Sequence, residues 1–327
     1  MSNSINTSKI IRLIISHNTF IFGRSVFDIF FSIFIWNTTD SIKILALFLI
    51  LRILAHTIGF TLLAALVKKG IPHLTRAASL FFLALSYLTI FILGESAIKY
   101  IIPIACTVGF FNGIYWISYL VMQFDITNTQ NRGNYNGTNL AGKTIALLLA
   151  PVVGGAAIFY NLFGLGYGNI SIIGSIAYLF SILIGYIKIE KIKHPPLHLI
   201  KTFKIISKQK EIVRLMIGRF FGNFGYKGAV ERLLPILIFE TLGNELHLGG
   251  LMSLFSITAI LTTFLVGKFV SYKKYPEIVT FGGSLFFIST LSIVGIPSII
   301  TYILYGFSRE ILLPLLEIRQ SVLSLQD

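Results

Sequence analysis

The stretch Phe22-Gly23-Arg24-Ser25-Val26-Phe27-Asp28 lies inside an apolar run from Asn18 to Asn37. About 20 apolar residues in a helix suffice to cross a bilayer. Arg24 and Asp28 are four residues apart and therefore share one face of that helix. A lone charge near the bilayer centre costs about 3 kcal/mol or more. We therefore expect the pair to face protein or water, either as an internal salt bridge or as a substrate- or proton-linked pair beside a central cavity.

The composition is that of an integral membrane protein. Of the 327 residues, 55% are hydrophobic and 12% are charged, whereas soluble domains carry about 25% charged residues. The formal net charge of +14 comes mostly from short loops between apolar runs, which indicates contact with anionic lipid headgroups rather than with nucleic acid. With one cysteine, Cys106, neither an internal disulfide nor a cysteine metal site is expected.

The hydropathy pattern predicts an all-α integral membrane protein of about ten transmembrane helices and no strands. The predicted spans are 18–37, 44–67, 77–93, 101–122, 138–160, 170–187, a seventh within 212–242, 248–270, 277–296 and 298–316. The first six would form an N-terminal half (1–187), followed by a basic cytoplasmic linker (188–210) and a partial C-terminal half of about four helices (211–327).

The distribution of lysine and arginine predicts the orientation. Basic residues concentrate in the loop 68–76, in the linker 188–210 and in 268–274, which all fall on one side of the predicted membrane. Because basic loops stay in the cytoplasm, we expect a multi-pass protein of the plasma (inner) membrane with a cytoplasmic N-terminus.

An internal repeat relates the two halves. Lys68-Lys69 and Ser79-Leu80-Phe81-Phe82 recur 205 residues later as Lys273-Lys274 and Ser284-Leu285-Phe286-Phe287. Arg24-x-x-x-Asp28 has a counterpart in Lys227-x-x-x-Glu231. This pattern predicts pseudo-two-fold halves with a site between them near the midplane.

The polar residues within predicted spans are the candidates for solute or ion binding. We expect the two charged pairs to face each other across one cavity, with Asp28 or Glu231 exchanging a proton or holding a cation. Secondary candidates lie on the second and fourth spans, where a hydrogen-bonded histidine or an aromatic packing stripe are the alternatives. The full set is Arg24, Asp28, Arg52, His56, Asn112, Tyr115, Lys227 and Glu231. Arg309 and Glu310 are adjacent, so we expect them to point in different directions.

The chain resembles the major facilitator superfamily on three features. These are the six-plus-six plan with a basic central loop, the basic loops after the second and eighth spans, and Gly137-x8-Ala146-x3-Ala150-Pro151-Val152-Val153-Gly154-Gly155. The last is similar to a signature of that family's antiporters, with alanine at two glycine positions. Val67 stands where the family's loop signature has aspartate. The resemblance implies gating or structural roles for Gly70, Pro151, Gly154 and Gly155, and Pro235 is a further candidate because proline bends helices.

These observations together predict a secondary active transporter, a permease for a small polar or amphipathic solute, working by alternating access and coupled to protons. Its partners would be the lipid bilayer, the solute and protons, with no nucleic acid, cofactor or metal. No nucleotide-binding loop, zinc-protease motif or serine-hydrolase motif occurs, so we do not expect an enzyme. The alternative is a non-transporting sensor, assembly partner or lipid-handling protein on the same fold. The family has twelve helices and this chain ends after the tenth, so we expect a fragment or a second half completed in another way.

Overall fold

The structure, a computed structural model, describes residues 2–67, 71–128, 130–188, 204–222, 229–269 and 275–323. Within these ranges it is built of helices, which confirms the predicted all-α membrane bundle. The helices are α1 (Ser2–Thr39), α2 (Ile42–Val67), α3 (Pro72–Leu93), η1 (Gly94–Tyr100), α4 (Ile101–Ile126), α5 (Arg132–Phe159), η2 (Leu162–Gly164), α6 (Gly168–Gly185), α8 (Lys210–Gly222), α9 (Ala229–Leu242), α10 (Glu245–Phe269), α11 (Tyr275–Gly295) and α12 (Ile299–Leu323).

Each predicted span except the seventh coincides with one helix, but several helices extend beyond the apolar runs. The first span was predicted from Asn18, whereas α1 begins at Ser2, and α5 begins at Arg132 rather than at 138. Hydropathy detects the part of a helix that lies in hydrocarbon, while backbone hydrogen bonds set where the helix ends. The predicted seventh span corresponds to α8 and α9, and residues 223–228 between them lie outside the described residues.

Seven stretches in the described ranges are long and apolar enough to cross a membrane. One of them, Pro72–Ile126, contains both α3 and α4, which the short helix η1 joins. The buried share of the most apolar 18-residue window is 61% in α1 and 11% in α11. Helix α1 therefore lies inside the bundle, and most of α11 faces outward.

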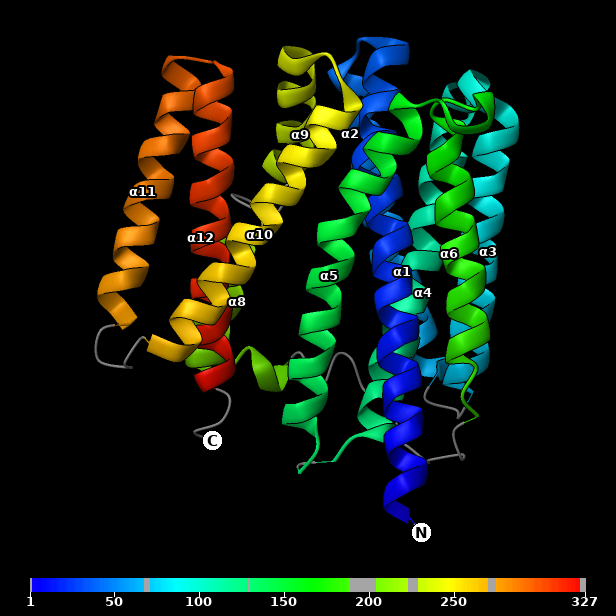
Figure 1. The fold of residues 1–327 in the computed structure, drawn as a ribbon. Coiled ribbons are helices and arrows are strands. Elements are labelled where there is room, and N and C mark those ends of the chain that lie inside the picture. Colours follow the sequence, from blue (N-terminus) through cyan, green and yellow to red (C-terminus); the bar gives the residue numbers. More distant parts are fainter. Residues whose placement is uncertain are drawn as a thin grey trace.

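Helices α1–α6 pack into one group and α9–α12 into another (Figure 1). Within the first group α2 packs on α4, α3 on α4 and α6, and α1 on α5 and α6. The groups meet where α5 packs along α10 and α1 touches α9. The first residues of α1 and the last of α12 lie at the same end of the bundle, here called the N-terminal end, and the opposite end is called the seam end (Figure 1).

Glycines allow the tightest helix contacts in the first group. Gly109 and Gly113 of α4 lie directly against the backbone carbonyls of Arg52 and His56 in α2, with no space for a side chain. Small residues four apart let two helix backbones approach closely in a membrane. In the same way, Gly23 of α1 lies against Gly174 of α6. These contacts fix the axial positions of Arg24, Arg52 and His56.

We expect Gly113→Ala to destabilise the protein by about 1–3 kcal/mol, because the added methyl group would overlap the carbonyl of His56. Gly250→Ala is the matched control, since its methyl group would meet no atom within 4 Å. The measurement is the temperature at which each purified variant loses its monodisperse size-exclusion peak in detergent. Equal temperatures for the two variants would contradict the proposed packing.

Candidate functional site

A carboxylate held by two arginines lies within the helices of the first group. Asp28 Oδ2 accepts a hydrogen bond from Arg24 Nε at 3.2 Å. Arg52 Nη2 lies 2.9 Å from the same oxygen and 2.6 Å from Oδ1. Arg24 and Asp28 thus share one face of α1, as their spacing predicts, and the cluster also ties α1 to α2.

The three members of this cluster differ in exposure. The side chains of Asp28 and Arg52 are 6% and 8% exposed, whereas that of Arg24 is 28% exposed. Sequence spacing placed Arg52 beside His56, but its guanidinium group pairs with Asp28 of another helix. A buried cation needs a counter-charge, so Asp28 and Arg52 stabilise each other, and Arg24 is the most exposed member of the cluster.

His56 and Asn112 lie close together between α2 and α4. His56 is partly exposed, and its backbone carbonyl lies against Gly113, the residue after Asn112. Asn112 is 2% exposed, and its Oδ1 atom has no hydrogen-bond donor among the described residues. This pair therefore offers one buried acceptor but no charge.

Tyr115 belongs to a separate aromatic cluster. Its hydroxyl group lies 2.8 Å from Nδ1 of His17, and the His17 ring stacks on Tyr119 at 3.8 Å between ring centroids. The guanidinium carbon of Arg76 is 5.5 Å from the centre of the Tyr115 ring. Arg76 also donates to the carbonyl of Gly185 at 3.0 Å and contacts Ser16. Because Tyr115 is fully buried in this cluster, its position favours packing over direct solute contact.

Two parallel stripes on α5 determine how the two groups of helices meet. The first stripe, at four-residue spacing, is Gly142, Ala146, Ala150 and Gly154. Gly142 and Gly154 touch Asn18, Val26 and Phe30 of α1, and both alanines are buried. The second stripe is displaced by one residue along the chain and includes Leu147, Pro151 and Gly155.

The second stripe faces α10. Gly155 lies against the backbone of Glu245, and Gly249 of α10 lies against the carbonyl of Pro151. Ser253 donates a hydrogen bond to the carbonyl of Leu148 at 2.6 Å. Three residues expected to have gating or structural roles therefore lie where α5 contacts α1 and α10. They are Pro151, Gly154 and Gly155.

Hydrogen bonds close the seam end between the two groups. Trp36 donates to Glu240, with 2.5 Å between Nε1 and Oε1. The Tyr167 hydroxyl donates to Glu245 Oε1 at 2.7 Å and accepts from Asn37 Nδ2 at 3.1 Å. Burial raises the pKa of Tyr167, and its hydrogen bond to the Glu245 carboxylate raises it further. Tyr167 therefore keeps its proton and remains a donor at neutral pH.

Lys143, Asn139 and Asn18 are polar residues within the bundle that we did not single out from the sequence. Asn139 and Lys143 lie four residues apart on α5 and continue the stripe of Pro151 and Gly155 toward the N-terminal end. The Oδ1 atoms of Asn18 and Asn139 are buried without a donor among the described residues. The signal was present, since Lys143 is a basic residue inside a predicted span.

Several predicted residues cannot be placed in the site. Gly70 and Lys227 lie outside the described residues, and Glu231 belongs to α9 but its side chain is outside them. Whether the two charged pairs face each other thus stays a prediction. Pro235 lies buried inside α9. The expectation for Arg309 and Glu310 was wrong, since Nη1 and Oε1 are 2.7 Å apart, because long side chains on adjacent residues can bend toward each other.

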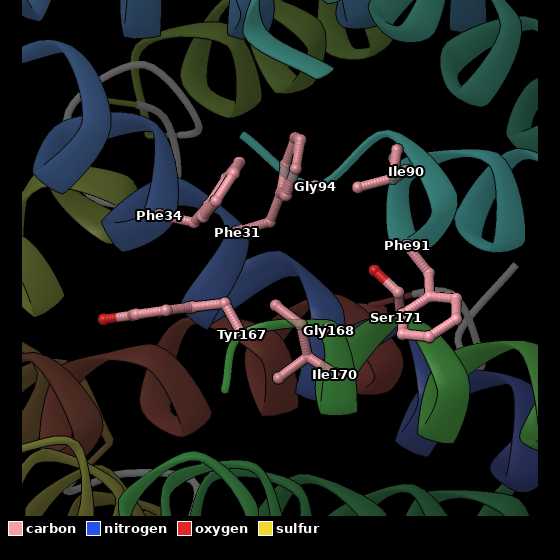
Figure 2. A pocket seen from close by; sticks show the side chains of 9 residues that line it. All are labelled: Phe31, Phe34, Ile90, Phe91, Gly94, Tyr167, Gly168, Ile170 and Ser171. Atoms are coloured by element: carbon pink, nitrogen blue, oxygen red, sulfur yellow. The ribbon is translucent and has the colours of Figure 1, made fainter. Parts of the chain in front are cut away.

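A small apolar pocket lies between α1, α3 and α6 near the seam end (Figure 2). Phe31, Phe34, Phe91 and Ile170 line it, and the hydroxyl group of Tyr167 points away from it (Figure 2). The pocket contains none of the charged candidates, so it is a gap in aromatic packing rather than the site for a polar solute.

A family model described as Major Facilitator Superfamily matches residues 13–316. The chain belongs to this superfamily. Membership and the apolar helices make it a multi-pass membrane protein with the fold of a membrane transporter.

Two bacterial relatives of this superfamily member are similar in sequence. A Bacillus subtilis (strain 168) protein, described as uncharacterized protein YqgE, is 22% identical over 294 residues, which cover 90% of this chain and 68% of that protein. A Geobacillus stearothermophilus protein, described as an uncharacterized protein in the sodM 3' region, is 25% identical over 133 residues, 41% of this chain and 62% of that protein.

Solved structures with the same fold are transporters of the superfamily. A bacterial homologue of the human lysosomal transporter Spinster, inward-facing and unoccupied, aligns with a TM-score of 0.72 at 14% identity and covers 97% of this chain and 74% of that one. The inward-open xylose transporter XylE from E. coli aligns with a TM-score of 0.54 at 15% identity, covering 92% of this chain and 80% of that one.

We expect Asp28→Asn to destabilise this protein by about 3–5 kcal/mol, because Arg52 would remain buried without its counter-charge. Arg24→Gln should cost about 1 kcal/mol or less, since its ion pair is partly exposed. Asp40→Asn is the control, because Asp40 is exposed and asparagine tolerates its positive φ of 45°. The measurement is chemical unfolding in detergent. Recovery in the double variant Asp28→Leu/Arg52→Met would support the pairing, and equal costs for Arg24→Gln and Asp28→Asn would contradict it.

Proposed function

We propose that this protein is a secondary active transporter that moves a small polar or amphipathic solute by alternating access, coupled to protons. Its N-terminal half would comprise residues 1–187 and its partial C-terminal half residues 211–327, joined by the basic linker 188–210. The solute would bind between them, with Arg24 and Lys227 attracting it and Asp28 or Glu231 exchanging the proton. His56 and Asn112 would supply neutral contacts.

The observation that carries the proposal is that, among the described residues, the contacts of α5 with α10 lie toward the seam end. The backbone contacts and hydrogen bonds between α5 and α10 run from Gly155 to Leu147 on α5 and from Glu245 to Ser256 on α10. Beyond these residues the two helices diverge toward the N-terminal end (Figure 1). A transporter that rocks about a central site has this asymmetry in each of its end states.

The orientation follows from the same asymmetry. With the N-terminus in the cytoplasm of a cell whose plasma (inner) membrane holds the protein, the closed seam faces outward and the separated helix ends face inward. The two similar transporter structures were solved in inward-facing and inward-open states, which supports this assignment. The many lysines of the linker 188–210 support the same orientation.

One observation favours the alternative of a non-transporting membrane protein. Asp28 and Arg52 are buried and paired within the first half, which is the arrangement expected of a purely structural ion pair. The partial exposure of Arg24 favours transport instead, because a third charge on the same carboxylate is not needed for pairing.

The proposal is tested by reconstituting the full chain in vesicles after a thermal-shift screen of a solute library has identified a ligand. We expect an imposed proton gradient to drive accumulation of that ligand at least tenfold above empty vesicles. Glu231→Gln should abolish the gradient-driven part, and Asp40→Asn should leave it unchanged. If the protein binds the ligand but does not carry it across the membrane under any imposed gradient, it is a sensor or assembly partner rather than a transporter.

A second prediction concerns the seam and needs no solute. Spin labels at Tyr160→Cys and His247→Cys, both exposed positions near the seam end, in a Cys106→Ser background should report mainly one short distance by electron paramagnetic resonance. Combining Trp36→Phe with Tyr167→Phe removes the donors of the seam hydrogen bonds to Glu240 and Glu245 and should increase a second, longer population several-fold. Glu95→Gln, an exposed change on η1, should not. A single unchanged distance in all variants would argue against rocking of the halves.

A further inference from the structure

Lys143 and Asn139 lie on the face of α5 that is directed toward the second half. Toward the seam end this stripe continues through Leu147, Pro151 and Gly155, which contact α10. The lipid-facing residues of α5 lie on a different side, where Ile145 and Leu149 are 56% and 49% exposed. Since α5 and α10 diverge toward the N-terminal end (Figure 1), this polar pair sits where the two helices have separated.

Lys143 has no hydrogen bond or ion pair with any residue that the structure describes. It is eleven residues, or about 16 Å, from the first residue of α5 and five residues inside the apolar span that begins at 138. The neighbouring amide oxygens of Asn139 and Asn18 are buried and lack donors within the described residues. The subsite thus offers one cation and two unused hydrogen-bond acceptors.

Among the residues that the structure describes, those in the interior of the first half have an excess of positive charge. Between the helix ends this interior contains Arg24, Arg52, Arg76 and Lys143 but a single carboxylate, Asp28. Asp125, one residue from the end of α4, has an interaction of its own. Arg76 lies over the Tyr115 ring, whose hydroxyl group contacts His17. Gly142, the residue before Lys143, touches Asn18, the residue after His17, so Arg76 and Lys143 lie near the same level of α1. In a low-dielectric interior such an excess attracts an anion.

We propose that Lys143, Asn139 and Asn18 form an anion-binding subsite, and that the transported solute carries a carboxylate, phosphate or sulfonate group together with hydroxyl or amine donors. This inference rests on the proposed function and narrows its solute class. Lys143 holds the anionic group, and the two asparagine oxygens accept hydrogen bonds from the solute's donors.

The subsite and Arg24 lie at different depths along the helix axes, which defines a path for the solute. Gly142 touches Asn18, so Lys143 lies at about the level of that residue. Arg24 is six residues further along α1, about 9 Å deeper into the bundle. An anion entering from the N-terminal end therefore meets Lys143 first and Arg24 second, and each cation can hold it while the other is vacant.

The test measures local potential with charged thiol reagents, so it needs no knowledge of the solute. In the full chain with Cys106→Ser, Asn139→Cys is labelled in detergent with anionic sulfonatoethyl methanethiosulfonate or cationic trimethylammonioethyl methanethiosulfonate. Each rate is divided by the reagent's rate with a small thiol in solution. We expect the normalised rate of the anionic reagent to exceed that of the cationic one about tenfold.

Matched variants separate the contribution of Lys143 from the general charge of the protein. Lys143→Met should reduce the preference several-fold, whereas Lys143→Arg should retain it and so show that the site still folds. Lys99→Met, which removes an exposed cation on η1, should change nothing. The lipid-facing Leu149→Cys should react slowly with both reagents.

An absent or inverted preference, a preference unaffected by Lys143→Met, or no labelling of Asn139→Cys would each overturn the inference. Because the assay uses no gradient and no solute, these results are independent of whether the protein transports. A failure of vesicle uptake with a normal labelling preference would overturn the proposed function alone.

Discussion

The arrangement of the first half depends on one buried charge balance, that of Asp28 between Arg24 and Arg52. The hydrocarbon region has no water to stabilise an unpaired guanidinium group, so Arg52 of α2 must reach α1. Helices α1 and α2 otherwise share few contacts, because α2 packs mainly on α4. The ion pair is therefore the main link between them. The glycines that bring α4 against the carbonyls of Arg52 and His56 hold the guanidinium group at the level of Asp28.

The sequence was sufficient to predict the helices and the pairing of Arg24 with Asp28, because both depend on local patterns. Apolar runs long enough to cross a membrane indicate helices directly, and a four-residue spacing indicates a shared helix face. Contacts between helices do not follow from spacing. Arg52 could have paired with His56 on its own helix, but it pairs with Asp28, and only the packing of α2, α4 and α1 decides between these partners.

The same limit explains why Lys143 was overlooked. Viewed along the sequence, it is a single basic residue near the N-terminal part of a span, and such residues commonly extend toward lipid headgroups. Its significance comes from the stripe that it shares with Pro151 and Gly155, which the structure places against α10. Tyr115 shows the reverse case. Its helical spacing with Asn112 suggested a solute-binding face, but its hydroxyl group pairs with His17 in a buried cluster.

Helix α5 combines two properties on one face. From Leu147 to Gly155 the face is formed by small or apolar residues and exposed carbonyl groups, so it can lie tightly against α10 and accept hydrogen bonds from Ser253 and Ser256. From Asn139 to Lys143 the face is polar. Close contact with α10 that excludes water would bury the unpaired Lys143 cation, which costs roughly several kcal/mol unless an anion is buried with it. A helix of this kind favours separation at its polar end while the site is empty. In the proposed transport cycle, binding of an anionic solute would remove that cost and allow the halves to approach. Occupancy of the site would then be linked to the rocking motion through charge alone.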